Sequence, residues 1–220
     1  MKLNLCDVPV YWINVDSQVN ENKEMKTMVE TLGFNNYERF SAITNIKPHE
    51  GVREGEEHYR CVAESHFHIL EKCLKEDIFP VIIFEDDIDC ELNNFKHVVE
   101  NVPDDADALY LGISHGDNNY SAIAWDDGIC KIERVFAAHA ILYFSKDYAK
   151  KVIEVGRSFI YEKNTPFDVG VAYEVQSKYN IYATNPPFFY QSNKKNSRNK
   201  WEHLTRTPLN TKKRFSIFTR

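Results

Sequence analysis

The sequence predicts an α/β fold with a mostly parallel central sheet covered by helices on both faces. First, apolar β-branched runs alternate along the chain with segments whose apolar residues recur at helical spacing. Second, 220 residues with 43% hydrophobic side chains are enough to bury one full core. Third, the most apolar run, Val81–Phe84, leads directly into a carboxylate cluster, and open α/β sheets bind ligands at the carboxyl ends of their strands. One domain is therefore expected.

In the first half of the chain, apolar runs predict core strands and amphipathic segments predict helices. Gly33 is expected to end the first helix, since glycine readily adopts the left-handed conformation found after helix ends. Residues 44–57 are polar and contain two glycines, which predicts a loop. The expected elements are strands at Val8–Val15, Glu38–Ile43 and Val81–Phe84, and helices at Glu21–Leu32 and Tyr59–Lys75.

The second half continues the alternation and adds a hairpin. Asp126-Asp127-Gly128 is a turn signal between two β-prone runs, and it predicts pairing of Ser121–Trp125 with Ile129–Val135. Ser145 is suited to cap a helix that runs to about Val155. The other expected elements are helices at Asn93–Asn101 and Phe167–Tyr179, and strands at Ala108–Ile113, Ala138–Phe144 and Ile181–Thr184.

The carboxylate cluster is the most informative feature of the chain. Glu85, Asp86, Asp87 and Asp89 crowd four negative charges into five residues, an unfavourable arrangement unless a cation or a positive ligand group compensates it. Hard divalent cations such as Mg²⁺ and Mn²⁺ prefer oxygen ligands of this kind. The alternative is an acidic, solvated loop that follows a core strand.

Charge and cysteine content set further expectations. Residues 191–220 contain nine Lys or Arg residues and one acid, although the whole chain has a net charge of −6. We therefore expect a domain over residues 1–190 and a basic C-terminal tail over 191–220, either a flexible end or a contact for anionic partners. Five cysteines without a CxxC pair indicate a reducing compartment. With no apparent signal peptide and no transmembrane stretch, the sequence predicts a cytoplasmic protein.

Several ordered segments carry a resemblance to a known family. The Val10–Asp16 segment ends in Ile-Asn-Val-Asp, and the Ile83–Ile88 segment contains Glu-Asp-Asp. The other matching segments are Tyr37–Ile43, Cys61–His66, Ala138–Tyr143 and Phe167–Asp168. Together they resemble glycosyltransferase family 25, which includes lipooligosaccharide galactosyltransferases and collagen galactosyltransferase domains.

The resemblance implies a single GT-A domain that takes a sugar from a nucleotide-sugar donor, expected to be a UDP-sugar, with Mn²⁺ or Mg²⁺. It implies Asp87 and Glu85 as metal ligands. Asp168 would remove a proton from the acceptor hydroxyl in an inverting transfer, although a helix-capping role is the alternative. His139 would lie near the metal or the acceptor, unless it is a core histidine. The residues implied for donor binding are Asn14, Asp16, Ser65, His66, Glu85 and Asp86.

The chain also departs from that family. The stretch Ser17–Lys23 lacks the arginines that usually follow the first strand, so Lys23 or the basic tail would have to replace them. The expected acceptor is a surface glycan, as in lipopolysaccharide biosynthesis. One alternative is a hydroxymethylated base in phage DNA, with the tail binding phosphates through Lys194, Lys195, Lys212, Lys213 and Arg214. The sequence is also compatible with a catalytically inactive nucleotide-sugar-binding module and with a metal-dependent hydrolase.

Overall fold

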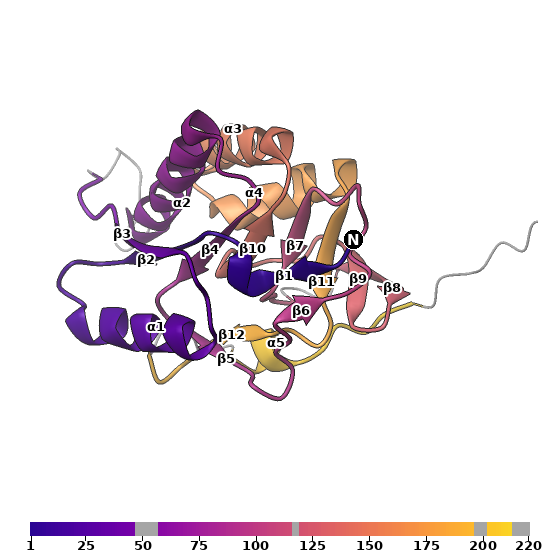
Figure 1. Cartoon of the computed structure of the whole chain (residues 1–220). Helices are drawn as coiled ribbons and strands as arrows, with labels where there is room; N and C mark the ends of the chain where they lie inside the picture. The colour runs from indigo at the N-terminus through magenta and orange to yellow at the C-terminus, as the bar shows by residue number, and fades with distance from the viewer. Residues whose placement is uncertain (47–56, 116–118, 196–201, 213–220) are drawn as a thin grey trace, which may run out of the picture.

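The computed structural model describes residues 1–46, 57–115, 119–195 and 202–212. Within them, eight strands form a central sheet in the order β3-β2-β4-β10-β7-β11-β9-β8 (Figure 1). Two small two-stranded sheets, β1-β6 and β12-β5, lie beside it. The strands are β1 Leu3–Asn4, β2 Val10–Asn14, β3 Tyr37–Ser41, β4 Val81–Glu85, β5 Ile88–Cys90, β6 Val98–Val99, β7 Ala108–Tyr110, β8 Ser121–Asp126, β9 Ile129–Glu133, β10 Ala140–Tyr143, β11 Ile181–Thr184 and β12 Phe189–Gln191.

The central sheet is mixed rather than mostly parallel. Strands β3, β2 and β4 run parallel to one another, and β7 runs parallel to β11. Strand β10 is antiparallel to both of its neighbours, β4 and β7, and the β8-β9 hairpin adds further antiparallel pairs. The prediction of a mostly parallel sheet is therefore confirmed only for β3, β2 and β4 and for the β7-β11 pair. Alternating strands and helices indicate the layers, but they do not specify the direction of a strand inserted from later in the chain.

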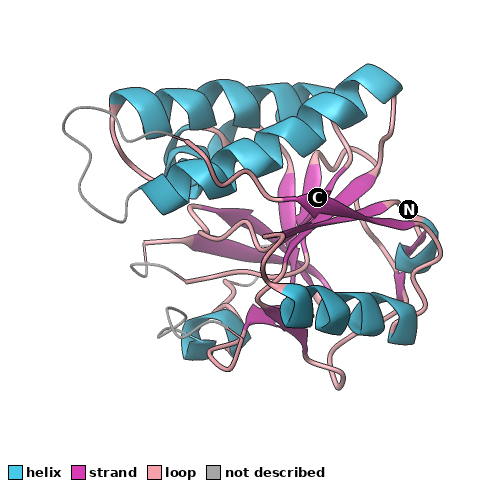
Figure 2. Cartoon of the chain, turned by 90° about the vertical axis from the view of Figure 1, so that its left-hand side faces the viewer, coloured by secondary structure: helices cyan, strands magenta, loops and turns pink. Residues whose placement is uncertain are grey.

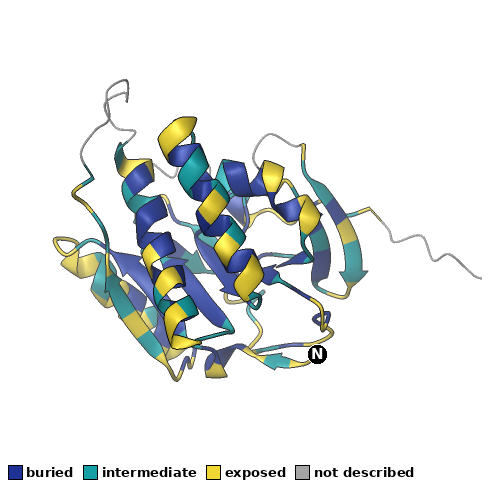
Figure 3. Ribbon diagram, turned by 90° about the horizontal axis from the view of Figure 1, so that it is seen from above, coloured by how far each residue is buried: buried dark blue, intermediate teal, exposed yellow. Residues whose placement is uncertain are grey.

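Helices cover one face of the sheet, while the other face has a mixed cover (Figure 2). The helices are α1 Val19–Thr31, α2 Glu57–Glu76, α3 Lys146–Glu162, α4 Phe167–Glu174 and α5 Glu202–Arg206, with short 3-10 turns at Leu5–Asp7 and Gln176–Lys178. Helices α2, α3 and α4 share a core with the sheet, and their buried stripes face it in Figure 3. On the opposite face, α1 contributes Met25 and Val29, and irregular chain contributes much of the rest. The predicted helical cover of both faces is thus not confirmed.

Strand β4 lies inside the sheet, and its residues alternate between the two faces. Val81 and Ile83 join the core under α2 and α3, whereas Ile82 and Phe84 join the core on the α1 side. None of these four side chains is exposed, which explains the continuous apolar run. The same alternation places Glu85 on the α2 side and directs Asp86 toward the α1 side.

Many predicted elements are confirmed, although their ends shift. The hairpin turns at Asp126–Ile129, Gly33 ends α1 with a φ of +76°, and the Ser145 hydroxyl accepts a hydrogen bond from the Tyr148 amide at 3.2 Å. The helix that follows Ser145 extends to Glu162, beyond the predicted Val155. Of the predicted loop at 44–57, residues 47–56 lie outside the described part of the chain.

The predicted helix at Asn93–Asn101 is wrong. Val98 and Val99 instead form β6, which pairs antiparallel with β1 at the N-terminus. The segment buries Val99 and Val102 against the α1-side core. A partner strand almost a hundred residues away in sequence therefore overrides the local helical pattern.

The described parts of the basic C-terminal segment pack against the domain. Arg206 of α5 lies 2.6 Å from the carboxylate of Glu91, and Leu209 is buried in the core. The Lys212 backbone bridges to Ile123 of β8. The boundary near residue 190 stays a prediction, but β12, α5 and residues 207–212 are integral to the described structure. No helix in the described residues is long and apolar enough to cross a membrane.

Candidate functional site

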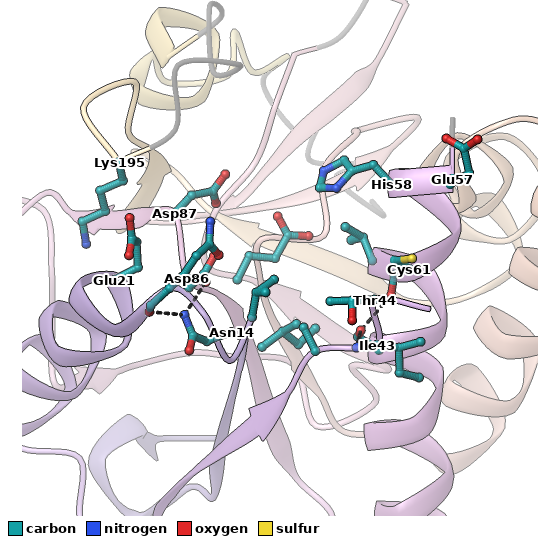
Figure 4. Close-up of a pocket in the computed structure, with 17 residues that line it drawn as sticks. Asn14, Glu21, Ile43, Thr44, Glu57, His58, Cys61, Asp86, Asp87 and Lys195 are labelled. Carbon is teal, nitrogen blue, oxygen red and sulfur yellow. Dashed lines mark hydrogen bonds between the residues drawn. The ribbon is translucent and has the colours of Figure 1, made fainter. Parts of the chain in front are cut away.

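Two cavities meet at the carboxyl end of β4, and both are lined by Glu85 and Asp87. The first cavity, of about 560 Å³, lies between the ends of β2 and β3 and the start of α2. Asn14, Asp86 and Lys195 lie at one end of it, and His58 and Cys61 lie at the other (Figure 4). The second cavity, of about 380 Å³, lies toward the start of α4 and is lined by Asp168 and Gln191 among others. The predicted acidic cluster is therefore where two potential ligand sites join.

Glu85 is held on both of its carboxylate oxygens. His66 of α2 places Nε2 3.2 Å from Glu85 Oε1, and Gln191 of β12 donates from Nε2 to Oε2 at 3.3 Å. The Glu85 side chain is 19% exposed, while His66 is fully buried. Burial lowers the pKa of His66 to about 3, which keeps the ring neutral and able to donate this hydrogen bond through Nε2. His66 therefore positions Glu85 and lines neither cavity.

Asp86 belongs to a network on the β2 side of the site. Asn14 Nδ2 donates to Asp86 Oδ2 at 2.7 Å, and Arg39 Nε donates to Asn14 Oδ1 at 2.9 Å. Arg39 thereby sets the orientation of the Asn14 amide. Arg39 also forms an ion pair with Asp16. Arg39 thus links Asp16 to Asn14, but Asp16 is 74% exposed and lines neither cavity.

Burial, with a smaller contribution from neighbouring carboxylates, raises the pKa values of Glu85 and Asp86. Burial is the main cause of the raised pKa of Glu85, and the charge of Asp87 adds to it. Burial likewise raises the pKa of Asp86 to about 6, against the opposing effect of the Asn14 hydrogen bond. Such repulsion would be relieved by a divalent cation.

The residues present fit such an ion. Mg²⁺ and Mn²⁺ sites that also bind substrate phosphates commonly use only one or two protein carboxylates, and Glu85 and Asp87 supply two at one edge of the sheet. The described residues contain no group of three or more His, Cys, Asp or Glu side chains arranged for a metal. The remaining ligands would have to come from substrate or water.

Ser65 lines the first cavity, but its hydroxyl is already in use. It donates to the Cys61 carbonyl at 2.7 Å and accepts from the Ile43 amide at 2.9 Å. The second bond ties the chain after β3 to helix α2. Ser65 therefore shapes the wall of the cavity.

Asp168 lies in the first turn of α4 and faces the second cavity. Its carboxylate accepts from the amides of Val169 at 3.0 Å and Ala137 at 3.2 Å, but the N-cap position belongs to Pro166, and α4 has no side-chain cap hydrogen bond. Burial still raises its pKa, because desolvation outweighs these hydrogen bonds. Ala137 adopts a φ of +88°, which directs its amide at Asp168 and is costly for a residue with a Cβ. Asp168 is therefore an oriented first-turn carboxylate that lines the same cavity as Glu85 and Asp87.

His139 lies just before β10, fully buried behind the carboxylate cluster. It lines neither cavity, and neither ring nitrogen has a well-formed hydrogen bond within the described residues. The Phe189 carbonyl and the Asp87 charge favour protonation, but burial dominates and lowers the pKa to about 4. Gly112 makes room for the ring, since a Cβ there would lie 2.2 Å from His139 Nε2. The predicted catalytic histidine is thus a core residue next to the site.

Sequence reasoning missed two residues of the site, Gln191 and Arg39, and it named Lys195 only as part of the basic tail. Gln191 contacts Glu85, Arg39 orients Asn14, and Lys195 lines the first cavity with its Nζ 2.7 Å from the Ile88 carbonyl oxygen. Gln191 and Lys195 come from β12 and the residues after it, where the chain was expected to begin a separate tail. Strand β12 pairs antiparallel with β5, and this pairing brings the C-terminal segment to the cluster.

Comparisons with known proteins do not identify a family for this chain. No protein-family profile and no curated protein matches the chain. Among solved structures, the chain is similar to one described as a crystal structure of a glycosyltransferase involved in the glycosylation of the major capsid of PBCV-1. The identity is 11%, the TM-score is 0.38, and the match covers 81% of this chain and 93% of that one. Membership in glycosyltransferase family 25 accordingly stays a prediction.

Proposed function

We propose that the protein is a metal-dependent glycosyltransferase of the family 25 type, which moves a sugar from a nucleotide-sugar donor to an acceptor hydroxyl with inversion. The observation that carries the proposal is the junction of two cavities at Glu85 and Asp87, on the carboxyl end of β4. A transferase needs a donor site and an acceptor site that share a reacting centre, and two cavities with shared carboxylates support this assignment. We propose a UDP-sugar as the donor and a glycan as the acceptor.

The donor would occupy the first cavity. Asp87 and Glu85 would hold Mn²⁺ or Mg²⁺, which as a Lewis acid would stabilise the departing diphosphate. Glu85 is oriented for this task by His66 and Gln191. Beside these carboxylates, Asn14 and Asp86 form a fixed polar wall suited to hydroxyl or amide groups of the nucleoside.

Asp168 would act in the second cavity as the base that removes the proton from the acceptor hydroxyl. A general base works best when its pKa lies close to the working pH, and burial moves Asp168 in that direction. Its two backbone hydrogen bonds hold the carboxylate in one orientation. The base and the metal-binding carboxylates would then act on one reacting centre from adjacent cavities.

Calorimetry and a donor assay with the variant Asp87→Asn test this function. We expect UDP-sugars to bind in the presence of Mn²⁺ and to be slowly hydrolysed when no acceptor is present. Asp87→Asn should reduce donor hydrolysis about 100-fold or more, because it removes a charge that holds the ion.

The matched control is Asp127→Asn, in the exposed β8-β9 turn, where Asn-Gly suits a hairpin. It should leave hydrolysis unchanged. Binding of UDP-sugar without hydrolysis or transfer would identify an inactive binding module instead. The absence of any metal-dependent nucleotide binding would contradict the proposal altogether.

A further inference from the structure

We propose that the second cavity selects an uncharged sugar as acceptor and rejects phosphorylated or polyanionic acceptors, DNA included. This inference rests on the proposed function, and it names the class of acceptor that the function leaves open. It is carried by three features of the cavity: its charge, its aromatic wall and its size.

The charge of the lining is negative. Four carboxylates face the cavity, and none of its described lining residues is Lys or Arg; the four are Glu85, Asp87, Asp168 and Glu202. Arg206 partly neutralises Glu202 at 3.2 Å, but Asp168 has only neutral backbone partners. A phosphate group on the acceptor would therefore meet negative charge that no described Lys or Arg of the lining compensates.

The metal would not remove this repulsion. The ion held by Glu85 and Asp87 would arrive with the diphosphate of the donor, whose negative charge offsets it. Lys195 lines the first cavity, where it would be available to a phosphate, and it does not line the second. The described lining of the first cavity thus includes a lysine, whereas that of the second includes neither Lys nor Arg.

The remaining lining suits a sugar ring. Tyr59, which is 50% exposed, and the partly exposed Phe136 offer aromatic surface, and Phe167 adds apolar surface beneath them. Sugar rings bury their C–H faces on aromatic side chains while their hydroxyls donate to carboxylates. A volume of about 380 Å³ lies at the small end of the range for ligand sites and favours one or two sugar rings.

A base from DNA fits this cavity poorly. It would have to be extruded from the helix, and its flanking phosphates would meet the negative charge of a lining that includes Glu202 and Asp168. Proteins that hold DNA neutralise those phosphates with Lys or Arg, which the described lining lacks.

The test is a transfer assay with matched acceptors at fixed UDP-sugar and Mn²⁺. Neutral glycosides are compared with their 6-phosphates and with oligonucleotides that carry hydroxymethylcytosine, while donor hydrolysis without acceptor is followed separately. We expect kcat/KM to be at least tenfold higher for the best neutral glycoside than for its 6-phosphate, and no transfer to DNA. Glu202→Gln keeps the side-chain shape and removes a negative charge. It should reduce the ratio of kcat/KM for the neutral glycoside to kcat/KM for its 6-phosphate.

The aromatic wall is tested with Tyr59→Ala, with Tyr59→Phe as the matched control. The alanine variant should raise the acceptor KM about tenfold, whereas phenylalanine should behave like wild type because it keeps the ring. If the donor is hydrolysed but phosphorylated acceptors or DNA are used as well as neutral glycosides, the inference is wrong and the proposed function stands. If neither hydrolysis nor transfer occurs, both are wrong.

Discussion

At the scale of single residues, Lys195 places a positive charge in the wall of the cavity proposed for the donor. It lines the first cavity, its side chain is only 12% exposed, and it lies 3.8 Å from Glu24. The stretch Ser17–Lys23 lacks arginines, and Lys195 supplies a cation from the other end of the chain. An ammonium group has three N–H donors, and Nζ of Lys195 donates one to the Ile88 carbonyl, so donors remain for a phosphate oxygen.

Lys195→Met should weaken donor binding. The loss of a charge-assisted contact to the diphosphate is expected to raise the donor KM about tenfold or more, corresponding to about 1.5–3 kcal/mol. Affinity for UDP should fall, and affinity for uridine should not. Lys194→Met is the matched control, because Lys194 is the exposed neighbour and does not line the cavity. Equal effects of the two substitutions on UDP binding would show that Lys195 has no special role.

At the scale of elements, the crossing of α2 and α3 holds the helix that positions His66. Gly156 of α3 lies against Phe67 of α2, where a Cβ would approach Phe67 Cζ to 2.4 Å. Phe67 is fully buried and cannot move away freely. The absence of a side chain at residue 156 therefore sets the separation of the two helices.

Gly156→Ala should destabilise the protein in spite of the better helix propensity of alanine. Propensity favours alanine by up to about 1 kcal/mol, while overpacking a buried contact costs about 1–3 kcal/mol. We expect a net loss of about 1 kcal/mol in urea unfolding. Glu154→Ala, at an exposed position of the same helix, should be nearly neutral. If Gly156→Ala instead increases the free energy of unfolding, α2 and α3 can move apart to accommodate the added Cβ without destabilising the protein.

At the scale of the whole molecule, stability depends on neutral histidines buried beside the carboxylates. The pKa of His139 is lowered to about 4, below the ordinary value of 6.5, so the unfolded chain takes up a proton that the folded protein refuses. The stability that His139 contributes is complete above pH 6.5 and is lost as the pH falls toward 4. The pKa of Asp86 is raised to about 6, above its ordinary value of 3.8. The folded protein therefore binds this proton more readily than the unfolded chain, so the contribution of Asp86 to stability increases as the pH falls from 6 to 3.8.

His139→Gln should therefore flatten the acid side of the stability curve. With a chelator present, we expect the free energy of unfolding of wild type to fall more between pH 7 and pH 4.5 than that of the variant, by up to about 3 kcal/mol. The comparison uses the slope with pH, so a general loss of stability in the variant does not affect it. Parallel curves for the two proteins would indicate that His139 titrates normally.

Much of this architecture can be read from local sequence. Strands β2, β4, β10 and β11, the β8-β9 hairpin, and helices α1 to α4 all follow from hydrophobic period and turn chemistry. The carboxylate cluster at the end of β4 could also be predicted, because a buried apolar run that stops in acids is visible without a structure. These features depend on near neighbours in the chain.

The rest depends on contacts between distant segments. The direction of β10, the β1-β6 pairing that replaces a predicted helix, and the return of β12 to β5 join residues many positions apart. The same contacts bring Gln191 and Lys195 to the site, bury His139 behind it and leave Asp16 outside. Residue type and spacing describe a strand or a helix, since its hydrogen bonds and buried faces are local. Which side chains share a cavity is decided only when the whole core packs, because burial and charge at each position then depend on every segment at once.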